Sequence, residues 1–373
     1  MTARTVLITG GAGFVGSHTA DALIASGHRV RIFDNLSPQV HPDGFPDYIP
    51  KCAQFLKGDV RDLETLRAAV RGADVIFHFA AAIGVGQSMY QISEYTSVNN
   101  LGTANLLQAI LDTRSRPEKL IVASSMSIYG EGKYLCADCG EVAPPLRSAQ
   151  QLRDKQWETK CPFCGQTVSP VSTPEGKPLQ CSSVYALSKK DQEEMALLFG
   201  RTYDIPVVAL RFFNIYGSRQ SLSNPYTGVA AIFASRLING NAPFVFEDGL
   251  QKRDFVSVHD VVQANLLAMS SSAANGMVLN VGSGQPVTIC EVASELAAAL
   301  GVSIPFEITG KYRSGDIRHC FADISKTKTL LGYKPRIHLK EGMGNLVGWL
   351  KGQSARDQLD KAMEDLKVYG LVS

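Results

Sequence analysis

The sequence predicts an α/β fold in which helices cover both faces of a parallel sheet. Short apolar runs predict buried strands at 5–9, 29–34, 53–59, 74–80, 119–125, 206–214 and 276–282. Helical patterns at 17–27 and 63–72 lie between the early strands. Continuous apolar strands joined by helices are typical of a doubly wound parallel sheet.

The bulk composition is that of an ordinary globular enzyme. The chain has 373 residues, 45% hydrophobic and 19% charged, with a net charge of +2. This length suits two lobes, and the small net charge does not favour nucleic acid or an anionic membrane as a partner. The opening residues are too quickly polar for a signal peptide, and no run of 18 apolar residues occurs, so we expect a cytoplasmic protein without a membrane span.

A glycine-rich turn follows the first predicted strand, in "TVLITGGAGFVGSH". Gly10 permits a tight turn, Gly13 lets the backbone approach a pyrophosphate, and Gly16 lets the helix pack on the strand. Asp34 ends the second strand, where a carboxylate accepts hydrogen bonds from ribose hydroxyls and repels a 2′-phosphate. The sequence therefore predicts a Rossmann-type domain that binds NAD in preference to NADP. A glycine turn that binds nothing is the alternative, and the strand and helix around the turn disfavour it.

Further cofactor contacts are expected at the ends of the following strands. Asp59 in "GDV" is placed to bond the adenine amino group, small residues in "FAAA" allow close approach, and Asn99 offers a polar partner. The full predicted set beyond the glycines and Asp34 is Phe14, Val15, Asn35, Leu36, Ser37, Asp59, Val60, Phe79, Ala80, Ala81, Ala82, Asn99, Tyr185, Lys189 and Phe213.

A catalytic pair is predicted in "VYALSKK". Tyr185 and Lys189 are four residues apart, so on a helix they share one face. An ammonium group near a tyrosine lowers the tyrosine pKa, and such a tyrosine acts as a general base on a sugar hydroxyl. Ser125, at the end of a strand, is expected to bond the same hydroxyl. Tyrosine and lysine at this spacing more often lie on a solvated helix face. The glycine turn and the "SS" strand end earlier in the chain make a catalytic role a more specific interpretation here.

Together the motifs carry a family resemblance. The segments "TGGAGFVGSH", "SSMSIYG", "YALSK", "RFFNIYG", "RDFVSVHDV" and "RSGDIRHCFADISK" resemble the extended short-chain dehydrogenase/reductases, and more narrowly the NAD-dependent nucleotide-sugar epimerase/dehydratase family. The resemblance covers nearly the whole chain except about 131–182 and the last twenty or so residues. It implies Ser125, Tyr185 and Lys189 as the catalytic set, a nucleotide-diphosphate sugar as substrate, and a homodimer.

The same resemblance implies substrate contacts in the second half of the chain. Asn214 is expected at the diphosphate or sugar, and Arg253 and Arg313 at the diphosphate, since a guanidinium fork suits phosphate. Asp316 is expected at the nucleotide ribose, and Asn224 is a weaker substrate-side candidate. Surface ion pairs are the alternative for both arginines.

Two positions after Ser125 separate epimerases from dehydratases. Dehydratases of the family carry an Asp-Glu pair there, whereas this chain has Met126 and Ser127. Because methionine neither donates nor accepts a proton in such a step, we expect oxidation and reduction at sugar C4 without elimination. The resemblance favours a dTDP- or UDP-hexose, above all a dTDP-6-deoxyhexose such as dTDP-L-rhamnose. A UDP-glucuronate decarboxylase, a nucleotide-sugar dehydratase and a non-enzymatic NAD-binding regulator remain alternatives.

Four cysteines predict a structural zinc site. Cys136 and Cys139 form one CxxC pair, Cys161 and Cys164 form another, and each pair ends in glycine. Four thiolates complete a tetrahedral zinc site. Free thiols or a redox pair are the alternatives. The other cysteines (Cys52, Cys181, Cys290 and Cys320) lack such spacing and are expected to be ordinary thiols.

The cysteines lie in a segment that interrupts the α/β pattern. Ser125 and Tyr185 are 60 positions apart, much further than is usual in the family, so 131–182 is expected to be a zinc-ribbon-like insertion near the substrate mouth. Its basic residues are interspersed with acidic ones, which disfavours a nucleic-acid module. The predicted organisation is an NAD-binding domain at 1–205 that contains the insertion, then a smaller mixed α/β substrate lobe at 206–373 interleaved with the last sheet strands. An amphipathic surface helix is expected at 354–370.

Overall fold

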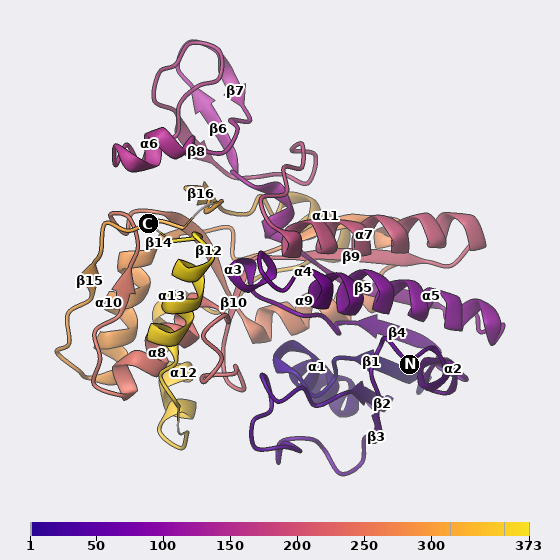
Figure 1. Cartoon of the computed structure of the whole chain (residues 1–373). Helices are drawn as coiled ribbons and strands as arrows, with labels where there is room; N and C mark the ends of the chain where they lie inside the picture. Colours follow the sequence, from indigo (N-terminus) through magenta and orange to yellow (C-terminus); the bar gives the residue numbers. More distant parts are fainter. Residues whose placement is uncertain (1, 314, 354, 373) are drawn as a thin grey trace.

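The computed structural model describes residues 2–313, 315–353 and 355–372. Its centre is a seven-stranded parallel sheet in the order β13-β9-β5-β4-β1-β2-β3 (Figure 1). The strands are β1 (Thr5–Thr9), β2 (Arg29–Asp34), β3 (Gln54–Lys57), β4 (Val75–His78), β5 (Lys119–Ser125), β9 (Val207–Phe212) and β13 (Val278–Val281). Each predicted strand lies in this sheet, so the predicted α/β class and parallel sheet are confirmed.

Helices cover both faces of the sheet. One face packs against α1 (Phe14–Ala25), α9 (Val258–Ser270) and α11 (Ser325–Leu331). The other face packs against α2 (Leu63–Val70), α5 (Gly102–Asp112) and α7 (Val184–Tyr203). The strand order reverses between β1 and β4, and in open parallel sheets the crevice at such a reversal is where ligands bind.

A smaller lobe lies beside the carboxyl ends of the strands. Its strands are β10 (Asn214–Tyr216), β11 (Phe244–Val245), β12 (Lys252–Ser257), β14 (Pro286–Thr288), β15 (Glu307–Ile308) and β16 (His319–Cys320). Its helices are α8 (Val229–Ile238), α10 (Ile289–Leu300), α12 (Leu339–Leu350) and α13 (Leu359–Val368). Residues after position 205 thus build this lobe and also supply β9, β13, α9 and α11 to the large sheet layer.

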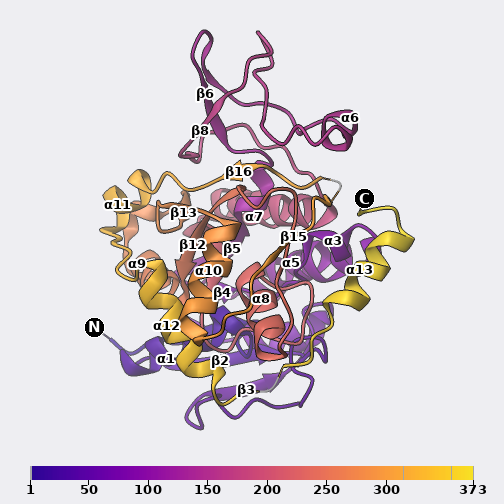
Figure 2. The same cartoon turned by 90° about the vertical axis from the view of Figure 1, so that its left-hand side faces the viewer.

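Residues between the 3₁₀ turn η2 (Met126–Tyr129) and α7 form a separate projection above the sheet (Figures 1 and 2). It contains β6 (Lys133–Cys136), β7 (Gly140–Val142) and β8 (Ser169–Val171), paired antiparallel in the order β7-β6-β8, and α6 (Ala149–Arg153). Its buried apolar cluster holds only Tyr134, Cys136, Val142, Cys161 and Val168. So small a core needs a further source of stability.

Short elements connect these layers. They are α3 (Val85–Ser88), α4 (Ile92–Tyr95), the π-helix η1 (Thr96–Leu101), and the 3₁₀ turns η2 (Met126–Tyr129) and η3 (Ser272–Ala274). Within the described ranges, no helix is both long enough and apolar enough to cross a membrane.

Candidate active site

A cavity of about 660 Å³ lies where the sheet meets the smaller lobe. Most of the predicted cofactor and substrate residues line it: Gly10, Gly13, Phe14, Val15, Gly16, Asp34, Asn35, Ser37, Asp59, Val60, Phe79, Ala80, Ala81, Ala82, Ser125, Tyr185, Lys189, Phe213, Asn214, Asn224, Arg253, Arg313 and Asp316. Leu36 and Asn99 are not part of the lining. Residues that are remote in sequence therefore share one site.

The glycine-rich turn has the backbone geometry that a dinucleotide needs. Gly10 has φ +69°, and a Cβ there would lie 2.7 Å from the Ala80 nitrogen. Gly13 is the N-cap of α1 and has no side-chain cap, and Phe14 and Val15 line the cavity. The first N–H groups of a helix are available to an anion. The turn thus fits a pyrophosphate.

Asp34 is held in place by backbone groups. Its Oδ2 accepts from Ala12 N at 3.0 Å and its Oδ1 from Leu36 N at 2.9 Å. Leu36 thus acts through its N–H on Asp34, in a left-handed conformation with φ +54°. The carboxylate lies at the end of β2, where it suits ribose hydroxyls and disfavours a 2′-phosphate.

Two other predicted cofactor residues are engaged within the protein. Asp59 accepts two side-chain bonds from Arg61, at 2.9 and 2.8 Å, and one from Asn35 at 3.0 Å. The hydrogen bonds with Arg61 lower the pKa of Asp59 to about 2. Asn99 instead bonds both backbone groups of Ala82, at 2.8 and 3.1 Å, and the Ser188 hydroxyl at 2.8 Å. Asn99 thus positions the loop after β4 from behind the cavity.

Helix α7 presents the predicted catalytic pair, Tyr185 and Lys189. The Ser183 hydroxyl caps its N-terminus by accepting from Ala186 N at 3.1 Å, which sets Tyr185 in the first turn and Lys189 one turn later. Lys189 Nζ donates to the Ala123 carbonyl of β5 at 3.0 Å. Burial lowers the pKa of Lys189 to about 7.

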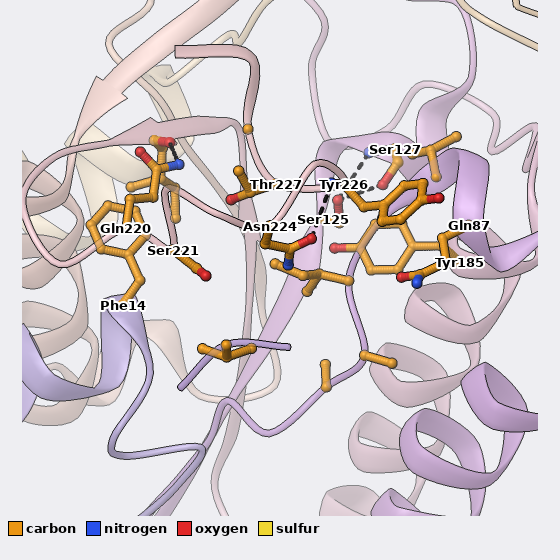
Figure 3. A pocket seen from close by; sticks show the side chains of 18 of the residues that line it. Phe14, Gln87, Ser125, Ser127, Tyr185, Gln220, Ser221, Asn224, Tyr226 and Thr227 are labelled. Carbon is orange, nitrogen blue, oxygen red and sulfur yellow. Dashed lines mark hydrogen bonds between the residues drawn. The ribbon is translucent and has the colours of Figure 1, made fainter. Parts of the chain in front are cut away.

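Tyr185 departs from the expectation that lysine lowers its pKa. Burial raises the pKa of Tyr185, and the opposing influence is its hydrogen bond with Ser125. Lys189 is directed to a backbone carbonyl instead. Figure 3 shows Ser125, Ser127, Gln87 and Tyr226 around Tyr185.

Among the described residues, the side-chain partner of Ser125 is a hydroxyl and not a carboxylate. Its Oγ lies 2.5 Å from the Oγ of Ser127, and Met126 also lines the cavity. Among the described residues, the carboxylates of the lining are Asp34, Asp59, Glu94 and Asp316. Glu94 pairs with Arg61 beside Asp59, and Asp316 pairs with Arg313. None of these contacts brings a carboxylate to Ser125.

The candidate diphosphate residues already have protein partners. Arg253 donates to the carbonyls of Ile317 at 2.6 Å and Arg318 at 2.8 Å. Arg313 Nε bonds Asp316 Oδ2 at 2.9 Å. A ligand that binds these arginines would therefore either add to their present hydrogen bonds or replace them.

Three amides of the lining carry an unsatisfied buried oxygen. They are the Oδ1 of Asn214 and the Oε1 atoms of Gln220 and Gln251. Buried polar atoms nearly always have a hydrogen-bond partner. A polar ligand in this cavity could donate hydrogen bonds to these three oxygens.

The C-terminal helix was not predicted as part of the site. Leu359, Ala362, Met363 and Leu366 of α13 line the cavity. Tyr226 links α13 to the site, since its hydroxyl donates to Asp365 at 3.2 Å and accepts from Tyr90 at 2.5 Å. The apolar spacing of α13 predicts a helix, but no local signal says which surface that helix covers.

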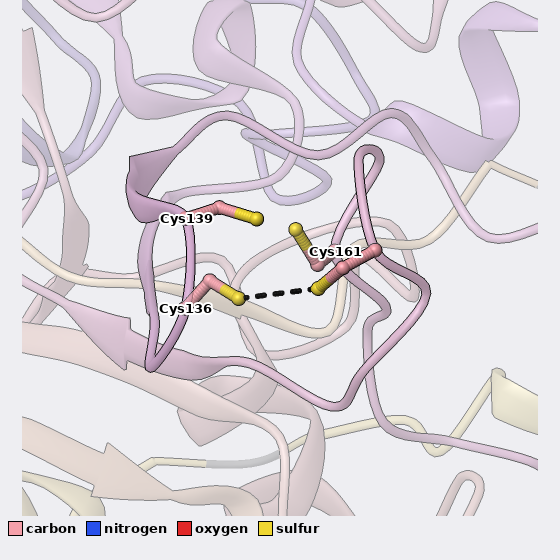
Figure 4. A group of neighbouring side chains, drawn as sticks. Cys136, Cys139 and Cys161 are labelled. Atoms are coloured by element: carbon pink, nitrogen blue, oxygen red, sulfur yellow. Dashed lines mark hydrogen bonds between the residues drawn. The ribbon is translucent and has the colours of Figure 1, made fainter.

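The four predicted cysteine ligands converge in the projection (Figure 4). All four sulfur atoms lie within 4.8 Å of one another, and Cys136 Sγ is 3.5 Å from Cys164 Sγ. Zinc–sulfur bonds of about 2.3 Å in a tetrahedron place the sulfurs just under 4 Å apart, so the cluster fits zinc. Burial opposes ionisation of Cys161, yet hydrogen bonds from the N–H groups of Cys164 and Phe163 bring its pKa down to about 7.

The fold and the glycine-rich turn of this crevice define the class of protein as an enzyme that binds a dinucleotide. The model of the NAD dependent epimerase/dehydratase family matches residues 6–148 and 159–282. The chain belongs to that family. The resemblance carried by the motifs is confirmed, as is the expectation of an NAD-dependent nucleotide-sugar epimerase.

Individual relatives differ in substrate. The chain is 34% identical to a dTDP-L-rhamnose 4-epimerase of Burkholderia thailandensis, over 93% of this chain and 95% of that protein. It is 30% identical to a UDP-N-acetyl-alpha-D-glucosaminuronate decarboxylase of Bacillus cytotoxicus, over 93% and 98%. The fold is similar to that of a UDP-glucose 4-epimerase from Thermus thermophilus in complex with NAD, with a TM-score of 0.73, 29% identity, and 93% and 99% covered.

Proposed function

We propose that the protein inverts C4 of a nucleotide-diphosphate hexose, with a dTDP-6-deoxyhexose as the favoured substrate. The observation that carries this proposal is the union of Ser125, Tyr185 and Lys189 in one cavity with Met126 and Ser127 beside them. Proton transfer at a hydroxyl is available there, and elimination lacks its acid and base. The complete catalytic set also disfavours a non-enzymatic NAD-binding regulator.

The residues of the cavity have distinct roles in this cycle. Ser125 holds the C4 hydroxyl while Tyr185 takes its proton, and Tyr185 returns that proton after the 4-keto sugar has turned over. The chemistry that NAD supplies when bound is the removal of a hydride from C4 and its return to the other face. Lys189 holds the nicotinamide ribose beside Tyr185.

The nucleotide half of the substrate anchors the sugar during this turnover. Asn214 has an unsatisfied buried oxygen, and Arg253 and Arg313 bring positive charge to the same wall. Asp316 is proposed at the nucleotide ribose and Asn224 at the substrate side. Binding energy from this remote end retains the keto intermediate while its sugar rotates.

Apolar side chains of the lining support a 6-deoxy sugar. They include Ile83, Val85, Met126 and Met363, and such groups would suit a methyl at C6. The similarity to a dTDP-L-rhamnose 4-epimerase points the same way.

A UDP-uronate decarboxylase is the second candidate, favoured by the relative from Bacillus cytotoxicus. A cation is the strongest partner for a sugar carboxylate. In the described part of the chain the lining cations are Lys189, Arg219, Arg253 and Arg313. Arg219 pairs with Asp21 and Arg313 with Asp316. Arg253 and Arg313 are proposed at the diphosphate and Lys189 at the ribose, so none of these cations is left for a uronate.

A panel of dTDP-, UDP- and GDP-sugars, with products separated by chromatography and weighed by mass spectrometry, tests the proposal. We expect a reversible new peak of unchanged mass with a dTDP-6-deoxyhexose. A product lighter by one water would indicate a dehydratase, and loss of carbon dioxide would indicate a decarboxylase.

The cysteine cluster is proposed to bind one structural zinc ion. Cys136, Cys139, Cys161 and Cys164 would fill all four positions, so no step of the reaction is assigned to the metal. Gly140 and Gly165, which follow the two pairs, have φ +74° and +76°. These left-handed glycines suit the knuckle turns. The metal would supply the stability that the small core of the projection lacks.

A homodimer is proposed through α7 and its neighbours. Leu187 and Leu198 of α7 are 53% and 57% exposed, and Leu101 at the end of η1 is 49% exposed. Helix α7 and η1 share the bond between Asn100 and Asp191, so these leucines belong to adjacent elements. A second copy would cover them. Sedimentation of the wild type and of Leu187→Glu tests this, with conversion to monomer as the expected result.

A further inference from the structure

A buried network of charges joins the projection to the substrate lobe. Arg147 comes from the projection, and its side chain is only 1% exposed. Its two terminal nitrogens each lie 2.8 Å from an oxygen of the Glu247 carboxylate. Glu247 follows β11, precedes β12, and is itself 2% exposed. This paired fork is the strongest polar link between the two parts that a guanidinium can form.

The rest of the network surrounds this fork. Arg318 is fully buried and bonds Glu247 at 3.0 Å, Asp248 at 2.6 Å and Glu158 of the projection at 2.6 Å. Glu131, also fully buried, accepts from the Arg318 N–H at 2.7 Å. Burial disfavours the charged form of Arg147, yet its hydrogen bonds with Glu247 outweigh this and raise its pKa. Both arginines therefore stay charged and bonded.

One bond of Arg147 reaches the substrate wall directly. Its Nη2, which bonds Glu247 Oε1, also donates to the Asp316 carbonyl at 3.1 Å. Asp316 N in turn donates to the Arg313 carbonyl at 3.2 Å. Arg313 and Asp316 line the cavity, whereas Arg147 does not. Arg147 thus touches the backbone of the wall from outside.

The cavity side of the same segment is held by Arg253. Its guanidinium donates to the carbonyls of Ile317 and Arg318, next to the carbonyl that Arg147 holds. Phe246, the neighbour of Glu247, lies under the Arg313 guanidinium at 4.9 Å. Removing Arg147 would break the hydrogen bonds to the Asp316 carbonyl and to the Glu247 carboxylate together. The segment around Asp316 would then lose its contacts on the side away from the cavity.

We propose that Arg147 is a positioning residue for nucleotide-sugar binding, through which the projection holds Arg313 and residues 315–317 in the geometry that the substrate needs. The inference rests on the proposed function for the identity of the ligand. It assigns the projection a role in affinity and none in the chemical step, since Ser125, Tyr185 and Lys189 have no bond to Arg147.

The test compares Arg147→Met with Arg153→Met. Arg153 is an exposed arginine of α6 in the same projection, and among the described residues its side chain bonds Gln150 alone. Hydrogen exchange of 310–319 is measured first, without any ligand. We expect exchange at least about tenfold faster there in Arg147→Met, with β1 to β5 unchanged, and no change in Arg153→Met.

Affinity and turnover separate positioning from general stability. We expect Kd for dTDP, measured by calorimetry, and KM to rise about tenfold in Arg147→Met, with kcat within about threefold of wild type and NAD content unchanged. Arg147→Lys keeps the charge but loses the paired hydrogen bonds to Glu247. Its Kd and KM should lie between those of wild type and Arg147→Met. Unchanged exchange and Kd, or equal losses in kcat and NAD content, would overturn the proposal.

Two arrangements keep the test decisive. Arg147→Met leaves the buried Glu247 carboxylate without its paired arginine and could fail to fold for that reason. In that case the double variant Arg147→Met/Glu247→Gln, which also removes the carboxylate charge, replaces the single variant in every comparison. If wild type binds neither dTDP nor UDP, the proposed substrate class fails. The ligand-free exchange comparison still decides whether Arg147 orders the segment.

Discussion

The hydroxyl oxygens of Ser125 and Ser127 lie 2.5 Å apart at the end of β5. Ser127 also donates its backbone N–H to Ser125 Oγ at 3.2 Å, so the two residues form one local turn. A dehydratase of this family would have a carboxyl group at position 127. In this chain Ser127 occupies that position and hydrogen-bonds Ser125, which faces Tyr185. A hydroxyl therefore stands where a dehydratase would have an acid or base.

Tyr185→Phe should abolish most of the epimerase activity. The variant keeps the ring but loses the hydroxyl that we propose exchanges a proton with the substrate, and a positioned acid–base group contributes about 10²- to 10⁴-fold. Single-turnover rates and NAD content would be measured. Tyr203→Phe, at the exposed end of the same helix, is the matched control and should behave as wild type.

Ser125→Ala should shift the pH–rate profile to higher pH. Burial raises the pKa of Tyr185, and the hydrogen bond with Ser125 opposes that rise. Without the hydroxyl, the tyrosine loses its proton only at more alkaline pH. Because Ser127→Ala leaves Ser125 in place, it should shift the profile less. Identical profiles for Ser125→Ala and wild type would contradict this role.

Lys189→Met should inactivate the enzyme and yet stabilise the nucleotide-free protein at neutral pH. Burial lowers the Lys189 pKa from 10.5 to about 7. The unfolded chain therefore binds more protons than the folded one between about pH 7 and 10.5, and wild-type stability rises with pH across that window. The Tm advantage of Lys189→Met should be largest at or below pH 7 and vanish towards pH 10.5. Calorimetric scans at several pH values check this.

Removal of zinc should disorder the projection and leave the sheet folded. We expect about one zinc per chain by elemental analysis, and loss of most of it in Cys136→Ser. Hydrogen exchange should then rise over 133–171, while β1 to β5 stay protected. Cys52→Ser, at an exposed cysteine outside the cluster, is the control. Wild type that carries no metal and whose four thiols alkylate freely would refute the site.

Leu366→Ala should weaken substrate binding from the C-terminal end. Leu366 is 5% exposed, packs with the cluster around Tyr90, and lines the cavity. Truncation of a buried leucine costs about 2 to 5 kcal/mol of stability, and less where the site can collapse. We expect a higher KM for the sugar nucleotide with nearly unchanged NAD binding. Val368→Ala, 76% exposed in the same helix, should change neither quantity.

Much of the fold was predictable because its signals are local. The strands at 5–9, 29–34 and 119–125 are apolar runs, and Gly10 and Gly16 are needed wherever a chain turns this tightly from strand to helix. The pairs Tyr185–Lys189 and Cys136–Cys139 are close in sequence, so their spacing alone places each pair on one face or in one turn.

Partners from distant segments were not predictable in the same way. Asn99 was expected at the cofactor but supports Ala82, and Arg313 pairs with Asp316. The sequence indicated a helix near the C-terminus without showing that Leu366 would face Gly86. Each of these contacts joins residues whose proximity depends on how whole elements pack.

By itself, the sequence determined the parallel sheet, the dinucleotide turn and the family, and it predicted the serine, tyrosine and lysine that share the cavity. Hydrophobic periodicity and fixed motif spacing act over a few residues, so they can be read along the chain. Only the tertiary structure decided that Arg147 would reach Asp316 and that α13 would wall the cavity. A buried charge must find a partner wherever packing brings one within reach, and that partner can lie more than a hundred residues away, as Asp316 does from Arg147.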